Sequence, residues 1–314
     1  MRSRWLALPA AAAAALDQRG FEGVPFDLRG FEPFDLRGFE GEGVERWLET
    51  FAIDLNNGRF RYTPSTQTPD LFGAIDAAHV LAAVGQLERL DSDARRRWKT
   101  EIDSYQSSDG FYHTPSQSKK TDKRGTIEHW AAAEATAALA LIGEALLAYA
   151  GGADDFLRWW VDFLADSSDA KLGLYACLGG GMATHGAQIG LGGNGALGQL
   201  AYPEALLEFA LALQDENGLF DEDPGSMSLD GIFQITRSAK QLGTLRSDFR
   251  VQGACLKLLR TMTPRLNNNS FLNDHYSVNS HVLPNVVAAV AECAEQFPRL
   301  VVTEREWTCC ARYV

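Results

Sequence analysis

Acidic, histidine and amide side chains recur near the start of the first helix of each predicted helix pair, and these residues are the best equipped to do chemistry. The residues that we predict to be catalytic are acids and histidines: Asp76, His129, Glu134, His185, Asp230 and His281. The residues that we predict to contact a substrate are His79, Gln234, His275, Tyr276 and Asn279. Carboxylates and imidazoles in one pocket supply general acid and base catalysis. The pattern predicts such chemistry without deciding which residue is acid and which is base.

Three of these polar residues lie at the same distance from a glycine that is expected to end a helix. Asp76, Glu134 and Gln234 each stand nine residues before such a glycine, namely Gly85, Gly143 and Gly243. Glycine is common just after a last helical turn, so the three side chains should occupy equal depths of equivalent helices. Polar groups at equal depths of a helical ring converge on one cavity. The alternative is a set of first-turn residues and N-caps that the helix dipole favours.

A turn pattern recurs along the chain and organises these helices. Gln-x-x-x-Gly-x-aromatic occurs at 106–112 and 214–220, with Asp in place of Gln at 54–60 and 169–175, and an eroded copy at 269–271. Successive copies are separated by 52, 63, 45 and 52 residues. Such a period accommodates two helices and their connections and is typical of stacked helical hairpins.

The segments between these turns have helical periodicity and helical punctuation. The expected helix pairs are 75–85 with 92–102, 129–143 with 155–164, 185–200 with 203–213, and 229–243 with 250–259, followed by a helix from 280. Pro203 suits a first helical turn. No segment alternates like a strand. The sequence therefore predicts an all-α protein with five to six helical hairpins, of which the sixth would be a degenerate one formed by the two ends.

The turn pattern, with Phe209 five residues before Gln214, resembles the QW repeat of the terpenoid cyclase and protein prenyltransferase β-subunit superfamily. The resemblance covers roughly residues 45 to 297 and implies an α/α toroid with inner and outer rings of helices. The acid motif of class II cyclases, Asp-x-Asp-Asp-Thr-Ala, survives only as fragments at 75–78 and 134–137. The Asp-x-Cys of a prenyltransferase zinc site is absent.

Several functions remain open for a toroid of this kind. The first is an enzyme that performs acid/base chemistry on a small terpenoid-like molecule or a neutral glycan in the central cavity. The second is a polysaccharide lyase, glycoside hydrolase or sugar epimerase. Residues 273–276, Asn-Asp-His-Tyr, contain the inventory of a lyase, or else form a polar loop that caps the fifth hairpin. The third is a non-catalytic binding or scaffold toroid.

The first 42 residues differ from the rest of the chain. Residues 25–32 and 33–40 are tandem copies of Pro-Phe-Asp-Leu-Arg-Gly-Phe-Glu, too short to bury a core of their own. This segment is either an extended arm that lies on the main body or a mobile leader. We expect residues 1–42 to be such a leader and residues 43–314 to form one toroid domain. Residues 1–16 have the charged start and apolar stretch of a secretory signal. A cytoplasmic location is favoured, with secretion as the alternative if that segment acts as a signal peptide.

Composition narrows the partners. The net charge of −12 argues against nucleic acid, and no apolar run reaches the ~18 residues of a membrane span. The expected partner is a small-molecule or glycan substrate. The five cysteines lack zinc spacing, so we predict no metal site and no cofactor, with a divalent ion left open. Oligomeric state and any pairing of Cys309 with Cys310 are not determined by the sequence.

Overall fold

The computed structural model describes residues 31–108, 112–116, 203–221 and 225–309, with single positions between 131 and 142. The described residues are mostly helical, as expected for an all-α protein. Their α-helices are α2 (Val44–Phe51), α3 (Leu71–Ala83), α4 (Ser92–Asp103), α8 (Pro203–Leu213), α9 (Ser226–Gln241), α10 (Phe249–Leu266), α11 (Asn269–Tyr276) and α12 (Val282–Gln296). None of these is long and apolar enough to cross a membrane. The expected helices 129–143, 155–164 and 185–200 and the turn at 169–175 lie largely or wholly outside the described residues.

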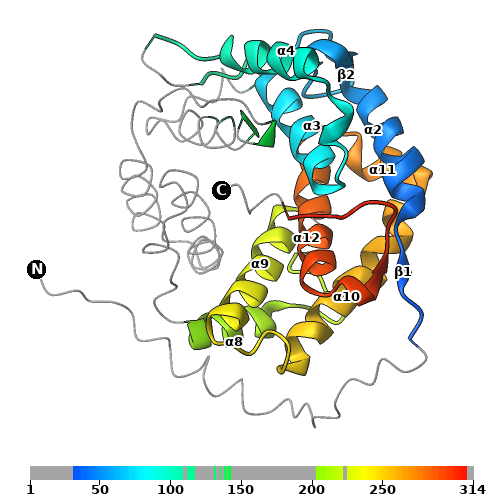
Figure 1. Ribbon diagram of the computed structural model, residues 1–314, viewed down its shortest axis with the longest axis vertical. Coiled ribbons are helices and arrows are strands. Elements are labelled where there is room, and N and C mark those ends of the chain that lie inside the picture. Colours follow the sequence, from blue (N-terminus) through cyan, green and yellow to red (C-terminus); the bar gives the residue numbers. More distant parts are fainter. Residues whose placement is uncertain are drawn as a thin grey trace, which may run out of the picture.

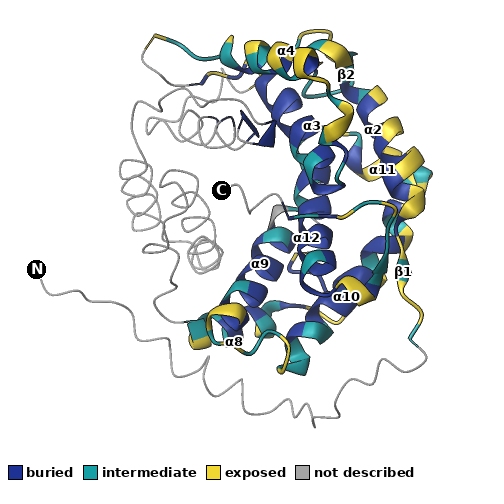
Figure 2. Ribbon diagram, viewed as in Figure 1, coloured by how far each residue is buried: buried dark blue, intermediate teal, exposed yellow. Residues whose placement is uncertain are grey.

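The described helices form two layers. Helices α3, α12 and α9 lie side by side in one layer, with α12 in the middle, and α4, α2, α11, α10 and α8 cover them from outside (Figure 1). The first layer is mostly buried, whereas the outer helices carry exposed faces (Figure 2). In α3 every residue except His79 and Ala82 is buried. A helix that is apolar all round belongs inside a protein, which explains why α3 is an inner helix.

Two of the predicted turns hold the layers together through their glycines. Gly58 and Gly218 have φ of 69° and 83°, a region that L side chains rarely adopt. A Cβ on Gly58 would lie 2.6 Å from the Trp98 ring of α4, and one on Gly218 would lie 2.3 Å from the Leu258 nitrogen of α10. The Gln214 amide nitrogen donates to the carbonyls of Gly218 and Ala254, both at 3.0 Å. The turn motif therefore allows an outer helix, α4 or α10, to pack directly against the glycine of the turn.

The structure corrects three details of the sequence interpretation. The eroded turn copy at 269–271 and the polar loop at 273–276 are both wrong, because these residues form α11, capped by Asn268. Short strands do occur: β2 (Ala52–Asp54) pairs antiparallel with β3 (Arg59–Phe60). A second pair, β1 (Phe34–Asp35) and β4 (Val301–Val302), is parallel and joins the two ends of the described chain.

The described chain joins the helical body earlier than the expected boundary at residue 43. A π-helix spans Phe39–Gly43 and continues into α2. Leu36, Phe39 and Glu40 are fully buried. The second octapeptide copy is thus part of the body, because its apolar side chains pack into the core that the rest of the chain provides.

Candidate functional site

Two of the predicted catalytic residues, Asp76 and His281, meet where α3 and α12 come together. Asp70 caps α3 by accepting from the Phe72 nitrogen, and the Thr114 hydroxyl binds the same carboxylate at 2.8 Å. This cap fixes the start of the helix and places Asp76 in its second turn, with 1% of the residue exposed. His281 stands just before α12, at its N-cap position.

The Asp76 carboxylate holds the His281 ring by a direct contact. His281 Nδ1 lies 2.9 Å from Asp76 Oδ1, and the Ser280 hydroxyl donates to Asp76 Oδ2 at 2.6 Å. The backbone around the ring is held as well, because the Ser280 nitrogen donates to the Tyr62 carbonyl and the His281 nitrogen to Asn279 Oδ1. Both carboxylate oxygens and the histidine backbone are therefore fixed in place.

Aromatic rings cover one side of the imidazole. The Phe72 ring centroid lies 5.3 Å from that of His281, and Tyr62 lies 6.2 Å from Phe72. The His281 side chain is 29% exposed while the Asp76 side chain is 1% exposed. A buried carboxylate thus orients a histidine that solvent can reach, an arrangement that suits proton transfer at the histidine.

The hydrogen bonds decide what each group can do. An ionised carboxylate only accepts, so an ionised Asp76 would take the bond from Nδ1 of His281 and make Nε2 the nitrogen that exchanges protons. Ser280 donates to Asp76 rather than to His281. It therefore orients the carboxylate and is not placed as the nucleophile of a Ser-His-Asp triad.

The other predicted residues are distributed over several elements. His79 lies one turn beyond Asp76 on α3 and is half-buried. Asp230 and Gln234 are buried on α9, which packs on the opposite side of α12 from α3. The Gln234 amide nitrogen donates to the Ser238 hydroxyl at 2.8 Å. These two α9 residues are therefore not part of the Asp76–His281 contact.

The residues of α11 and the loop after it also separate. His275 is exposed and stacks on Phe271 with 4.2 Å between ring centroids, whereas Tyr276 is 1% exposed. Adjacent helical residues point in different directions, so the lyase inventory at 273–276 does not face one substrate. Asn279 lies beside His281, because its amide oxygen accepts a hydrogen bond from the His281 backbone nitrogen. His129, Glu134 and His185 lie outside the described residues.

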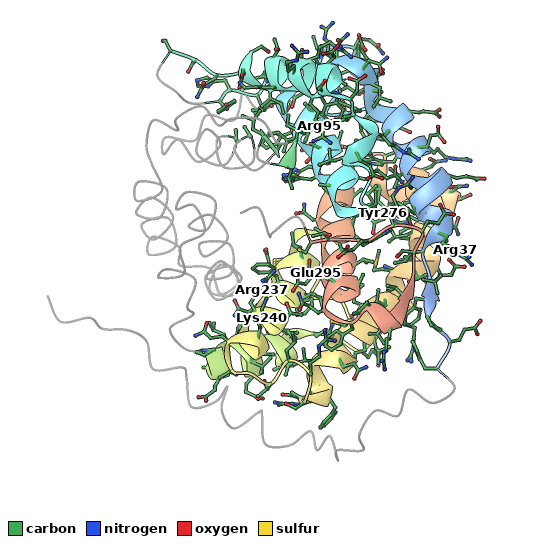
Figure 3. All side chains as sticks on the ribbon, viewed as in Figure 1. Arg37, Arg95, Arg237, Lys240, Tyr276 and Glu295 are labelled. Carbon is green, nitrogen blue, oxygen red and sulfur yellow. The ribbon has the colours of Figure 1, made fainter. Side chains whose placement is uncertain are left out.

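Sequence reasoning missed the partners of the site. Ser280 and Phe72 had no distinguishing pattern, although the position of Ser280 directly before His281 is a signal that could have been weighed. It also missed a buried carboxylate on α12, Glu292, which accepts from the Thr236 hydroxyl at 2.6 Å and pairs with Arg237 at 3.3 Å. Arg237 lies on α9 (Figure 3), so this contact joins α9 to α12.

Metal binding and similarity to known proteins add no further assignment. Within the part of the chain that the structure describes, no group of three or more His, Cys, Asp or Glu side chains could hold a metal ion. Comparisons with protein-family models, with curated proteins and with solved structures found no match. The chemistry of the Asp76–His281 contact therefore carries the functional conclusion.

Proposed function

We propose that the protein is an α/α-toroid enzyme that transfers protons to and from a neutral sugar substrate at His281. The observation that carries this proposal is the 2.9 Å contact between His281 Nδ1 and the buried carboxylate of Asp76. His281 is the proton-transferring group, and Asp76 orients the ring and stabilises the imidazolium that forms.

The toroidal arrangement is supported by the neighbours of α12. In a closed ring the last inner helix packs against the first, and α12 packs against both α9 and α3. The Arg95 guanidinium of α4 donates to the Ile142 carbonyl at 3.4 Å, as expected for adjacent hairpins. The strand pair β1–β4 joins the chain ends across the same closure.

The state of Asp76 favours sugar chemistry over alkene protonation. A cyclase that starts by protonating an alkene needs a carboxylic acid that keeps its own proton. Both Asp76 oxygens are engaged, Oδ2 by the Ser280 hydroxyl and Oδ1 by the His281 ring, so this carboxylate is placed to orient the histidine rather than to protonate an alkene. The net charge of −12 disfavours a polyanionic substrate. A neutral sugar fits both observations if its C–H proton next to the open-chain carbonyl is removed and a solvent-derived proton is returned to the same carbon, as in an epimerase.

Terpenoid chemistry is the second candidate, because Phe72 and Tyr62 give the histidine an apolar flank that suits an isoprenoid. Solvent-deuterium incorporation tests both candidates, since an epimerase and an alkene-protonating enzyme each transfer a solvent proton to carbon. We would incubate the protein in D2O with a panel of neutral mono- and oligosaccharides and with a panel of polyprenols, and analyse the products by mass spectrometry.

We expect deuterium in a sugar with the wild-type protein, and a rate at least ~100-fold lower for His281→Asn. His113→Asn is the matched control, since His113 is an exposed histidine whose ring is hydrogen-bonded to Ser107, and it should retain the wild-type rate. Incorporation into a polyprenol alone would favour the terpenoid candidate. If no deuterium enters either panel, or if His281→Asn keeps the wild-type rate, the enzymatic proposal is wrong and a binding or scaffold toroid is favoured.

A further inference from the structure

The second octapeptide, residues 33–40, lies against a surface formed by β4, Asn267 and residues 304–307, and we call this surface the groove. Phe34 and Asp35 form β1 in parallel register with Val301 and Val302, and the Leu36 nitrogen donates to the Val302 carbonyl at 2.9 Å. Leu36 itself is fully buried. The strand contacts fix the register, and the Leu36 side chain anchors it in the core.

Asn267, at the end of α10, forms hydrogen bonds with the backbone in the middle of the octapeptide. Its amide nitrogen donates to the Asp35 carbonyl at 2.7 Å, and its amide oxygen accepts from the Phe39 nitrogen at 2.8 Å. Gly38 lies so near that a Cβ there would be 3.0 Å from the same oxygen. Arg37, at the outer edge of the body in Figure 3, pairs with Asp35 of its own octapeptide at 2.7 Å.

Glu40 closes the octapeptide with a carboxylate that the groove is built to receive. It is fully buried, and its Oε2 accepts from the Glu304 nitrogen at 2.8 Å and from Trp307 Nε1 at 3.4 Å. The Arg305 guanidinium lies 3.5 Å from Oε1. A buried carboxylate is tolerated only with such partners, so this end of the groove selects glutamate.

Every side chain that the groove reads is present twice in the chain. Residues 25–32 repeat the octapeptide without a change, so Leu28 and Glu32 correspond to Leu36 and Glu40. We propose that this groove is a docking site for either copy, and that residues 25–32 of the same chain can replace residues 33–40. The displaced second copy then forms a loop between Glu32 and Gly41.

The second copy is favoured because the exchange has a cost. The entropy lost on closing a loop rises only with the logarithm of its length, so eight looped residues disfavour the first copy by on the order of 20-fold. The exchange also interrupts the π-helix Phe39–Gly43 and loses the contact of the Phe31 and Phe34 rings, now 5.5 Å apart. The first copy is thus a reserve that becomes visible when the second is impaired.

Substitution of the anchoring leucine in each copy tests the exchange in the full-length chain by urea unfolding. Leu28→Asp should leave the unfolding midpoint unchanged. Leu36→Asp should lower the folding equilibrium constant by no more than the exchange costs. That cost is on the order of 20-fold for closing the loop, and the loss of the π-helical turn increases it further. The double variant should lose at least about 100-fold more, as expected when a buried leucine is lost without replacement.

A single-copy chain is the matched control, because deleting 25–32 and deleting 33–40 produce the same sequence. This chain should fold, and Leu28→Asp in the chain that lacks 33–40 should cost as much as the double variant does. Equal losses for Leu36→Asp and the double variant would overturn the proposal. So would failure of Leu36→Asp to fold while the single-copy chain folds.

Disulfide trapping reports the register directly. Val302 faces Asp35 in the strand pair, so Asp35→Cys with Val302→Cys should crosslink in the parent chain under mild oxidation. In the Leu36→Asp background, Asp27→Cys with Val302→Cys should crosslink instead, within one chain. A crosslink that joins two chains, or none in that background, would contradict the exchange.

Discussion

At the scale of single residues, the pair of Asp76 and His281 predicts a defined imidazole tautomer. Asp76→Asn replaces an acceptor by a side chain that can donate, so the ring should carry its proton on Nε2 instead of Nδ1. We expect long-range ¹H–¹⁵N spectra of this variant to show that the His281 tautomer changes while the His275 tautomer stays as it is. The rate of deuterium incorporation into substrate should fall by up to ~100-fold relative to the wild-type protein. An unchanged tautomer would mean that the carboxylate does not set the state of the ring.

The sequence indicated the two residues of this contact, Asp76 and His281, but not the residues that position them. Asp76 and His281 could be predicted because each stands near the start of a helix whose periodicity is plain. The role of Ser280 could not be predicted, because it depends on how the loop before α12 meets α3, some 200 residues away in the chain. Contacts of that kind arise from tertiary packing and leave no periodic signal.

At the scale of elements, three glycines predict a graded response to alanine. Gly218→Ala should cost the most, since it combines φ of 83° with a Cβ 2.3 Å from backbone of α10. Gly243→Ala meets no atom within 4 Å but has φ of 71°, so we expect a loss of about 1–2 kcal/mol. Gly253→Ala, in open space inside α10, should gain about 0.5–1 kcal/mol. Urea unfolding checks the order, and a Gly253 variant less stable than the Gly243 variant would contradict it.

At the N-terminus of α10, Asp248 should make a contribution to the free energy of unfolding that depends on pH. Burial raises the pKa of Asp248, but hydrogen bonds and charge from Arg250 outweigh it, and the net pKa is lowered. A lowered pKa means stability that is present above ~3.9, the pKa of an unfolded aspartate, and is lost as pH falls through the folded value. Asp248→Asn keeps the cap, so it should cost about 1 kcal/mol at pH 7 and progressively less below pH ~4. A loss that does not change with pH would point to packing instead.

Element-level reasoning worked where local signals were strong. Helix α8 begins at Pro203 and ends at Leu213 as expected, and α4 ends one residue later than expected, at Asp103. It failed at α11, because Asn269 and Ser270 imitate a turn while Asn268 caps a helix. It also failed at β1, because a two-residue strand exists only through its partner at Val301 and Val302.

At the scale of the whole molecule, packing of α12 between α3 and α9 makes the buried thiols reporters of global opening. Cys255 lies on α10, Cys293 on α12 and Cys309 in the segment after β4, and all three are buried. Burial raises the pKa of the Cys293 thiol well above its usual range, and its neighbours Cys255, Glu292 and Cys309 raise it further. A thiol that stays protonated and out of solvent does not react.

We therefore expect iodoacetamide at pH 8 to leave these three cysteines unmodified in the native protein and to label them in urea, as read from their peptides by mass spectrometry. The Cys293 thiol interacts with both Cys255 and Cys309, so labelling of the three should appear together at the urea concentration where the protein unfolds. Labelling of Cys309 well before Cys255 and Cys293 would show that the C-terminal segment opens separately. In that case the chain ends would not close the helical body as one cooperative unit.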